Sequence, residues 1–267
     1  MPRANRYFIP GQVWHITHRC HKKEFLLKFE KDRKIWIRWL YVAKKRFGLS
    51  VLNYIVTSNH IHLLVYDTGT KVIPKSMQLI VGRTAQQFNQ RKKRKGAFWE
   101  DRYHATAVQT GDHLIRCLVY IDLNMVRAGA VSHPSRWQAS GYPEIQTPPM
   151  RKRIINVEIL TELCEIYNVD NFRTIHRQWV EDALKENRLV REAKWSEAIA
   201  VGNERYVEKT QRSLGLRAKA RSCQSTVDGF QLKEEVGEYS VHFGVKNVQL
   251  TQENGYFWSE INESSTA

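Results

Sequence analysis

Two short apolar segments joined by three polar residues constrain the fold of this 267-residue chain more than any other feature. Residues 49–56 (LSVLNYIV) and 60–66 (HIHLLVY) are rich in β-branched and aromatic residues, and Thr57-Ser58-Asn59 separates them. This pattern is typical of a β-hairpin. We therefore expect a sheet built around this hairpin.

Strand-like and helical segments flank the hairpin on both sides. Hydrophobic periodicity predicts these further elements, in order: a strand at 11–19, a helix over 29–48, a helix over 73–89, a strand at 105–109 and a helix over 111–129. This order favours an α+β fold of the ferredoxin-like type, with helices on one face of an antiparallel sheet. The other sheet face would be free for a ligand.

Composition shifts near residues 147–150, and we place a domain boundary there. Residues 1–146 would form the α+β domain, and residues 147–222 a mainly helical C-terminal extension. Helices are expected near 156–168, 170–187, 192–200 and 204–215. Residues 223–267 are rich in Ser, Gln, Glu and Gly, so this tail is poorly predictable and we expect part of it to be mobile.

The net charge of +15 is confined to the first part of the chain. Residues 1–150 carry 25 lysines and arginines against nine acidic side chains, whereas residues 151–267 carry 17 against 18. Such asymmetry points to a polyanionic partner, and nucleic acid fits better than a membrane surface. A basic domain that is merely soluble is the alternative.

Other classes of protein are disfavoured by composition. The four cysteines are far apart and form no C-x-x-C pair, which argues against a thiolate zinc site and a disulfide scaffold. No apolar run approaches the roughly 20 residues of a membrane span, and the first residues lack the apolar core of a secretory signal. We expect a cytoplasmic protein that associates with the nucleoid when bound to DNA, and no membrane partner.

His60 and His62 lie two positions apart in the second strand of the hairpin. Alternate residues of a strand point to the same face, so the two imidazoles project together and Ile61 points the other way. Two neutral imidazoles side by side suit a divalent metal ion. The alternative is a pair of exposed histidines on a sheet surface.

Tyr120 and Asn124 lie four positions apart in the helix predicted over 111–129, so they share one helix face. A tyrosine among leucine, valine and isoleucine is also common in a hydrophobic core. Taken alone, this pair therefore leaves a catalytic and a packing role open.

The combination of these features resembles the single-tyrosine HUH nucleases, and more closely the REP-associated tyrosine transposases and their insertion-sequence relatives. The likeness covers most of residues 7–142 and rests on five blocks in order: GQVWHITHR (11–19), NYIVTSNHIHLLV (53–65), FWEDRYHA (98–105), YIDLNMVRAG (120–129) and SRWQASGY (135–142). Met125 departs from the family, which often has proline there. Residues 196–215 resemble a C-terminal extension of some members.

The resemblance implies a site and a reaction. His60 and His62 would be metal ligands, Asn124 would supply a third ligand through oxygen, and Tyr120 would be the nucleophile. The metal would be Mg²⁺ or Mn²⁺. The implied reaction is cleavage and rejoining of single-stranded DNA at hairpin-forming, repetitive extragenic sequences, through a 5′-phosphotyrosine intermediate. The proton of the phenol would be handled by the cation, Arg127 or a lysine.

Three groups of side chains are candidates for DNA binding. The basic run Arg91, Lys92, Lys93, Arg94 and Lys95 would contact phosphates, or would simply be a solvated helix end. Trp99, Arg102 and Tyr103 would form a platform for unpaired bases, or an aromatic cluster closing the sheet edge. Arg127 completes the set. His15, His18 and His21 form no clean set, and we expect packing or phosphate contacts from them.

Rival functions remain open from the sequence. One is a domesticated DNA-binding protein that no longer transposes. Another is a metal-dependent nuclease that activates water and draws a carboxylate from Asp67, Asp101 or Asp122. An RNA-binding ferredoxin-like module is disfavoured because no RNP-type aromatic strand is present. A monomer and a homodimer are both compatible with the sequence.

Overall fold

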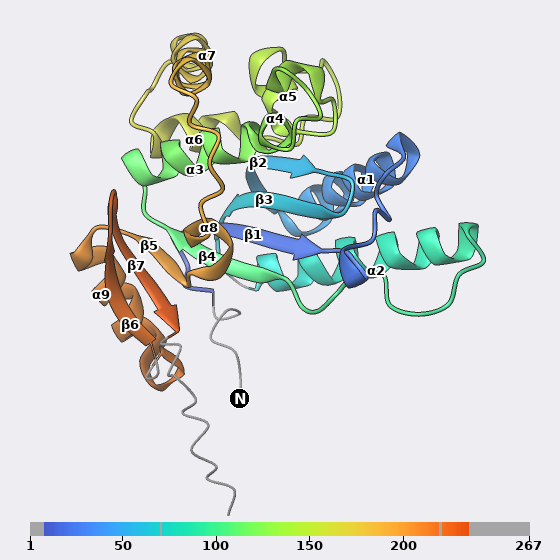
Figure 1. Cartoon of the computed structure of the whole chain (residues 1–267), viewed down its shortest axis with the longest axis horizontal. Coiled ribbons are helices and arrows are strands. Elements are labelled where there is room, and N and C mark those ends of the chain that lie inside the picture. The colour runs from blue at the N-terminus through green and yellow to red at the C-terminus, as the bar shows by residue number, and fades with distance from the viewer. Residues whose placement is uncertain (1–7, 70, 219–220, 235–267) are drawn as a thin grey trace, which may run out of the picture. The chain divides into compact units, whose positions relative to one another are not determined.

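The computed structural model describes residues 8–69, 71–218 and 221–234, and within them the chain builds one mixed sheet (Figure 1). Its strands are β1 (Val13–Arg19), β2 (Ser50–Val56), β3 (His60–Tyr66), β4 (His104–Val108), β5 (Ala200–Gly202), β6 (Arg221–Thr226) and β7 (Gly229–Glu234). Their order is β2-β3-β1-β4-β5-β7-β6, and only the β4–β5 pair is parallel. The predicted α+β class with a mostly antiparallel sheet is confirmed.

The predicted hairpin lies at one end of the sheet, with β3 between β2 and β1. Its turn is held by Thr57, whose main-chain N–H donates to the carbonyl of His60 at 3.0 Å. Ile61 and Leu63 are fully buried on one face of β3. The period of two therefore turns His60 and His62 to the opposite face, as the sequence predicts.

Helices precede, interrupt and follow the strands. They are α1 (Glu30–Phe47), α2 (Val72–Arg91), α3 (Asp112–Asp122), α4 (Asn124–Arg127), α5 (Gly141–Gln146), α6 (Val157–Leu163), α7 (Val169–Lys185), α8 (Lys194–Glu197) and α9 (Glu204–Leu214). Short 3₁₀ turns occur at His21–Lys23, Pro134–Arg136 and Gly215–Ala218. Gly48 ends α1 in the left-handed region, with φ of 72°, which favours glycine.

The helices are not confined to one face of the sheet, which corrects the expectation of a free face. Trp36 of α1 packs near Tyr54 of β2 on the Ile61 face. On the histidine face, α3 reaches β2 through a hydrogen bond between Asn53 and Asp122, and the segment containing α8 accepts a hydrogen bond from Thr106 of β4. The apolar stripe of α3 requires such a partner, so this helix cannot remain in solvent.

Two predicted helices differ in the structure. The helix expected over 111–129 breaks at Leu123 into α3 and α4. The helix expected over 192–200 is reduced to the single turn α8, and the chain then enters β5. The tail expected from residue 223 begins inside the β6–β7 hairpin, and residues 235–267 lie outside the described residues.

A buried polar network joins the region before residue 146 to the region after it. Asp122 of α3 accepts from the Nδ2 of Asn53 at 2.9 Å and pairs with Nε2 of His176 of α7 at 2.8 Å. The other ring nitrogen of His176 lies 3.0 Å from Nε2 of Gln146. Residues up to Glu234 form one compact unit. Residues on both sides of the predicted boundary at 146/147 therefore contribute strands to one sheet.

Replacing His176 with leucine is expected to lower the free energy of unfolding by about 3–5 kcal/mol, because it leaves Oδ2 of the buried Asp122 carboxylate without its ion-pair partner. Urea denaturation of the full chain measures this change. The matched control is Lys185→Leu on the same helix, an exposed position where the change is expected to stay below about 0.5 kcal/mol. Equal stability of the two variants would contradict the account of the network.

Candidate active site

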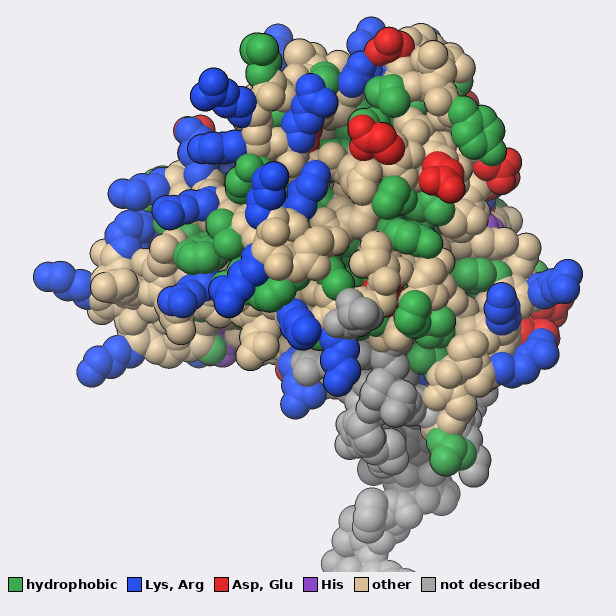
Figure 2. Space-filling model, turned by 180° about the vertical axis from the view of Figure 1, so that it is seen from behind, with side chains coloured by type: hydrophobic (Ala, Val, Ile, Leu, Met, Phe, Trp, Pro, Cys, Tyr) green, Lys and Arg blue, Asp and Glu red, His purple; other side chains and the backbone are tan. Residues whose placement is uncertain are grey.

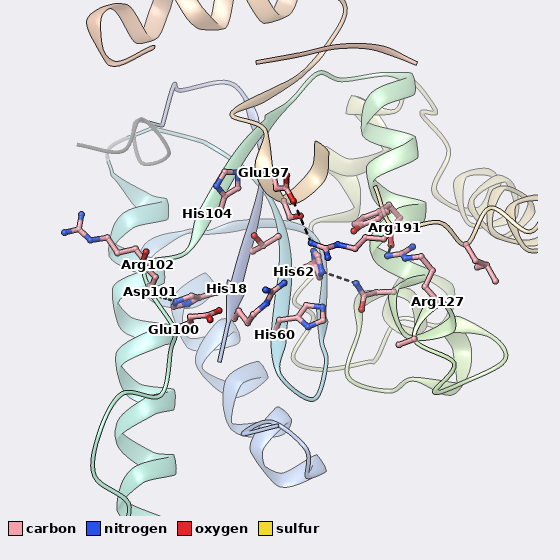
Figure 3. Close-up of a pocket in the computed structure, with 17 residues that line it drawn as sticks. His18, His60, His62, Glu100, Asp101, Arg102, His104, Arg127, Arg191 and Glu197 are labelled. Carbon is pink, nitrogen blue, oxygen red and sulfur yellow. Dashed lines mark hydrogen bonds and ion pairs between the residues drawn. The ribbon is translucent and has the colours of Figure 1, made fainter. Parts of the chain in front are cut away.

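A pocket of about 680 Å³ opens where β1, β3, β4 and α3 meet the segment around α8 (Figure 3). Its polar lining comes from both the predicted domain and the extension: Thr17, His18, Arg19, His60, His62, Glu100, Asp101, Arg102, His104, Tyr120, Asn124, Arg127, Arg191, Ser196 and Glu197. The four side chains singled out for metal binding and nucleophilic attack are all among them. The role of each in catalysis stays a prediction.

Both ring nitrogens of His62 are engaged. Its Nδ1 lies 2.8 Å from Nε2 of His15, which projects from the neighbouring strand β1. Its Nε2 lies 3.0 Å from the side-chain Nδ2 of Asn124. An amide nitrogen only donates, so Nε2 of His62 carries the lone pair and faces the pocket. The side chain of Asn124 is 9% exposed and so is available to the pocket.

His60 is oriented by its own turn. Its Nδ1 lies 2.7 Å from Oδ1 of Asn59 and 3.0 Å from Oγ1 of Thr57. The amide oxygen accepts, so Nδ1 carries the proton and Nε2 is left with a lone pair. The side chain of Asn124 is also within hydrogen-bonding reach of His60. Two imidazoles and one carboxamide therefore converge.

Burial keeps both histidines uncharged at neutral pH. It lowers the pKa of His60 to about 4, with a further contribution from the positive charge of Arg19. Burial lowers the pKa of His62 well below the usual 6.5, and the neighbouring rings of His15 and His60 add to this effect. Neutral imidazoles with free lone pairs are the protonation state that a metal ion requires.

This donor set fits a divalent cation that is held loosely. Two neutral imidazole nitrogens and an amide, which can present its oxygen after a rotation, leave coordination positions open for a phosphate. Within the described residues, no group of three His, Cys, Asp or Glu side chains is arranged to hold a metal. That His60, His62 and Asn124 hold Mg²⁺ or Mn²⁺ stays a prediction.

Tyr120 lies beside the histidines and beneath an arginine. Its ring is 5.9 Å from that of His62, and the guanidinium of Arg127 lies 3.9 Å from the ring centroid. Arg127 also donates to the main-chain carbonyl of Tyr120 at 2.8 Å, where the helix breaks between α3 and α4. Burial raises the pKa of Tyr120, and the charge of Arg127 partly opposes this rise. The same two side chains line a second cavity of about 710 Å³.

The predicted DNA-binding residues separate into two groups. Arg102 and Arg127 line the pocket. Trp99 does not, because its ring stacks on His18 at 4.2 Å and its Nε1 donates to the carbonyl of Val81. Tyr103 packs edge-on against the same histidine. Trp99 thus has the role of closing the sheet edge.

The basic run after α2 is only partly free for phosphates. Arg91 pairs with the buried carboxylate of Asp32, and Arg94 donates to the carbonyl of Ala97 at 2.9 Å. The exposed ammonium groups of the run are those of Lys92, Lys93 and Lys95. Figure 2 shows lysine and arginine side chains gathered over the half of the molecule that contains α1 and α2. Exposed cations on these two helices are Lys31, Lys34, Arg38, Lys45, Arg46, Lys75 and Arg83.

Two features of the pocket were missed by the sequence reasoning. His15 contacts His62 from outside the pocket. Alternation predicts the face of β1 on which His15 lies, but the pairing of β1 with β3 brings the two rings together. Arg191 and Glu197 reach the pocket from the C-terminal extension, 4.0 Å apart. No local pattern places that segment against β1 and β3, so no signal in the sequence would have found them.

The carboxylates considered for a water-activating nuclease are placed differently from one another. Asp122 is committed to Asn53 and His176, and Asp67 caps the turn at Gly69. Asp101 lines the pocket, as do Glu100 and Glu197.

Within the described residues, no helix is long and apolar enough to cross a membrane. No curated protein matches the chain significantly. Among solved structures, a REP-associated tyrosine transposase bound to a REP hairpin is 18% identical, with 57% of this chain and 90% of the other aligned at a TM-score of 0.46. A protein from Deinococcus radiodurans described as a candidate transposase is 15% identical over 47% of this chain and 95% of its own, with a TM-score of 0.32.

The family comparison covers the part of the chain that holds the central residues. The model of the IS200-like transposases matches residues 11–124, a span that begins just before β1 and ends at Asn124. It therefore includes both histidines of β3 and Tyr120. Over residues 11–124 the chain is thus similar to the IS200-like transposases.

Proposed function

We propose that this protein cleaves and rejoins single-stranded DNA by transesterification, with Tyr120 as the nucleophile. The observation that supports it is the convergence of Tyr120, Asn124 and two uncharged histidines, His60 and His62, in one basic-rimmed pocket. The target class, hairpin-forming repetitive extragenic sequence, follows from the resemblance of the sequence blocks.

His60, His62 and Asn124 would hold Mg²⁺ or Mn²⁺ through two Nε2 atoms and a carboxamide oxygen. When bound, such a cation offsets the negative charge that grows on a phosphodiester during attack. Burial of the two imidazoles removes competition from protons at neutral pH. The hydrogen bonds to Asn59 and His15 keep the two lone pairs aimed into the pocket.

Tyr120 would supply the attacking oxygen. A free phenol is ionised to only about one part in a thousand at pH 7, and burial here raises its pKa further. Arg127, whose guanidinium lies against the ring, opposes that rise and favours the phenolate. Attack forms the bond from the Tyr120 oxygen to phosphorus and breaks the bond from phosphorus to the DNA 3′ oxygen, which takes up a proton. The reverse reaction by a 3′-OH rejoins strands and needs no ATP.

Cations around the pocket would hold the DNA backbone. Arg19, Arg102, Arg127 and Arg191 line it, and the last of these belongs to the C-terminal extension. Contacts with phosphates position a strand without reading its bases. The extension would therefore help to bind the DNA backbone near the scissile phosphate.

A metal-dependent nuclease that activates water is the second candidate, because Glu100, Asp101 and Glu197 place carboxylates in the same pocket. Such an enzyme releases free 5′-phosphate ends, whereas attack by Tyr120 leaves the protein attached to DNA. A domesticated binding protein would leave the DNA intact. The state of the DNA after incubation therefore distinguishes the three candidate functions.

Replacing Tyr120 with phenylalanine is expected to abolish a covalent protein–DNA adduct, because the variant lacks the oxygen that attacks phosphorus. Full-length protein is incubated with labelled hairpin-bearing single strands and Mn²⁺, and the adduct is detected on a denaturing gel. The control is Tyr41→Phe in α1, which removes a hydroxyl outside the pocket and should leave the adduct at the wild-type level. An adduct that persists in the Tyr120 variant excludes the proposed nucleophile.

Binding of single-stranded DNA is expected to weaken steeply with salt. In log–log plots of affinity against salt concentration, each phosphate contact contributes a slope of about −0.7 for single strands. Alanine at Lys92, Lys93 and Lys95 together should make the slope shallower by about two, as measured by fluorescence anisotropy. Alanine at Lys152, Lys185 and Lys209, which lie in the extension, is the matched control. A wild-type slope in the first variant would exclude these lysines from the DNA path.

A further inference from the structure

We propose that His15 is a positioning residue that fixes which nitrogen of His62 carries the proton, and so keeps the lone pair of His62 Nε2 in the active pocket. The inference rests on the proposed function for its purpose, but the arrangement of protons can be observed without metal or DNA. His15 itself does not line the pocket.

The two rings form a close, buried pair. His15 and His62 project from neighbouring strands, and their ring planes differ by 10° with centroids 5.0 Å apart. Nε2 of His15 lies 2.8 Å from Nδ1 of His62. His15 is fully buried and His62 is 4% exposed, so water does not compete for this hydrogen bond.

The direction of this hydrogen bond follows from the neighbours of the pair. Burial disfavours an imidazolium, so each ring carries a single proton. The Nδ2 of Asn124 donates to Nε2 of His62, which places the His62 proton on Nδ1. Nε2 of His15 must then accept, and its own proton lies on Nδ1, a buried atom for which the described residues provide no hydrogen-bond partner. Donation thus runs from Asn124 in the pocket to His62, and from His62 to the buried His15.

If this acceptor is removed, no hydrogen bond holds the His62 proton on Nδ1. Without His15, the proton of His62 can move to Nε2, and the lone pair then points at the core instead of at a cation. Partners behind a metal-binding histidine typically contribute about 10- to 100-fold to metal affinity.

The test compares His15→Leu with His15→Gln in the full chain. Glutamine places an oxygen close to the position of Nε2 and can accept from Nδ1–H of His62, whereas leucine fills similar space without an acceptor. Nitrogen-15 NMR of histidine-labelled, metal-free protein reads the tautomer of His62. We expect the Nδ1–H form in the wild type and in His15→Gln, and a mixture or the Nε2–H form in His15→Leu.

Mn²⁺ affinity, measured by electron paramagnetic resonance, is the second readout. His15→Leu should bind about 10- to 100-fold more weakly than the wild type, and His15→Gln should regain most of this loss. His113→Leu, which alters a half-buried histidine outside the pocket, is the matched control and should match the wild type. Circular dichroism confirms that each variant is folded.

Three results would overturn the proposal: a wild-type His62 with its proton on Nε2, a folded His15→Leu variant with the wild-type tautomer, or equal loss of affinity in both His15 variants. If the wild type shows the Nδ1–H form but no Mn²⁺ binding, the proposed function fails while the role of His15 in setting the tautomer stands.

Discussion

The contact between the histidine face of β3 and the helix α3 is the constraint on which the rest of this site depends. Period two in the strand turns His60 and His62 toward α3, and helical spacing turns Tyr120 and Asn124 toward β3. The helix break after Asp122 keeps Asn124 within hydrogen-bonding distance of His62 and leaves the carbonyl of Tyr120 to Arg127. A shift of α3 by one turn would separate the ring of Tyr120 from the two imidazoles.

Hydrogen bonds on the far side of α3 hold this helix against the sheet. Asp122, which lies between Tyr120 and Asn124 in the chain, is locked to Asn53 of β2 and to His176 of α7. A buried charge with two partners is costly to disrupt and allows few alternative positions, so it specifies where α3 sits. The extension is thereby part of the same compact unit: α7 holds α3 in place, and the segment around α8 contributes Arg191 and Glu197 to the pocket.

Local patterns predicted most of the elements up to α4 and the faces on which side chains lie, because both depend on short-range periodicity. The same-face placement of His60 and His62 needs only alternation, and the pairing of Tyr120 with Asn124 needs only helical spacing. The partners of these residues depend on long-range packing. The sequence does not assign His15 a partner, because the histidines near it in the chain do not share one strand face. The sequence leaves Trp99 two roles, and its stacking on His18 favours closure of the sheet edge. The strands β5–β7 are short, and β6 and β7 lie in a polar region, so only their pairing with β4 and with one another defines them.

The central claim is that two imidazoles and a carboxamide form the cation site beside Tyr120. Crystals of the full chain grown with Mn²⁺, and analysed by anomalous scattering at the manganese edge, test it directly. The account predicts a manganese peak in contact with Nε2 of His60, Nε2 of His62 and the side-chain oxygen of Asn124. A peak held instead by Glu100, Asp101 and Glu197, with the two imidazoles uncoordinated, would contradict the account and favour a carboxylate-based nuclease.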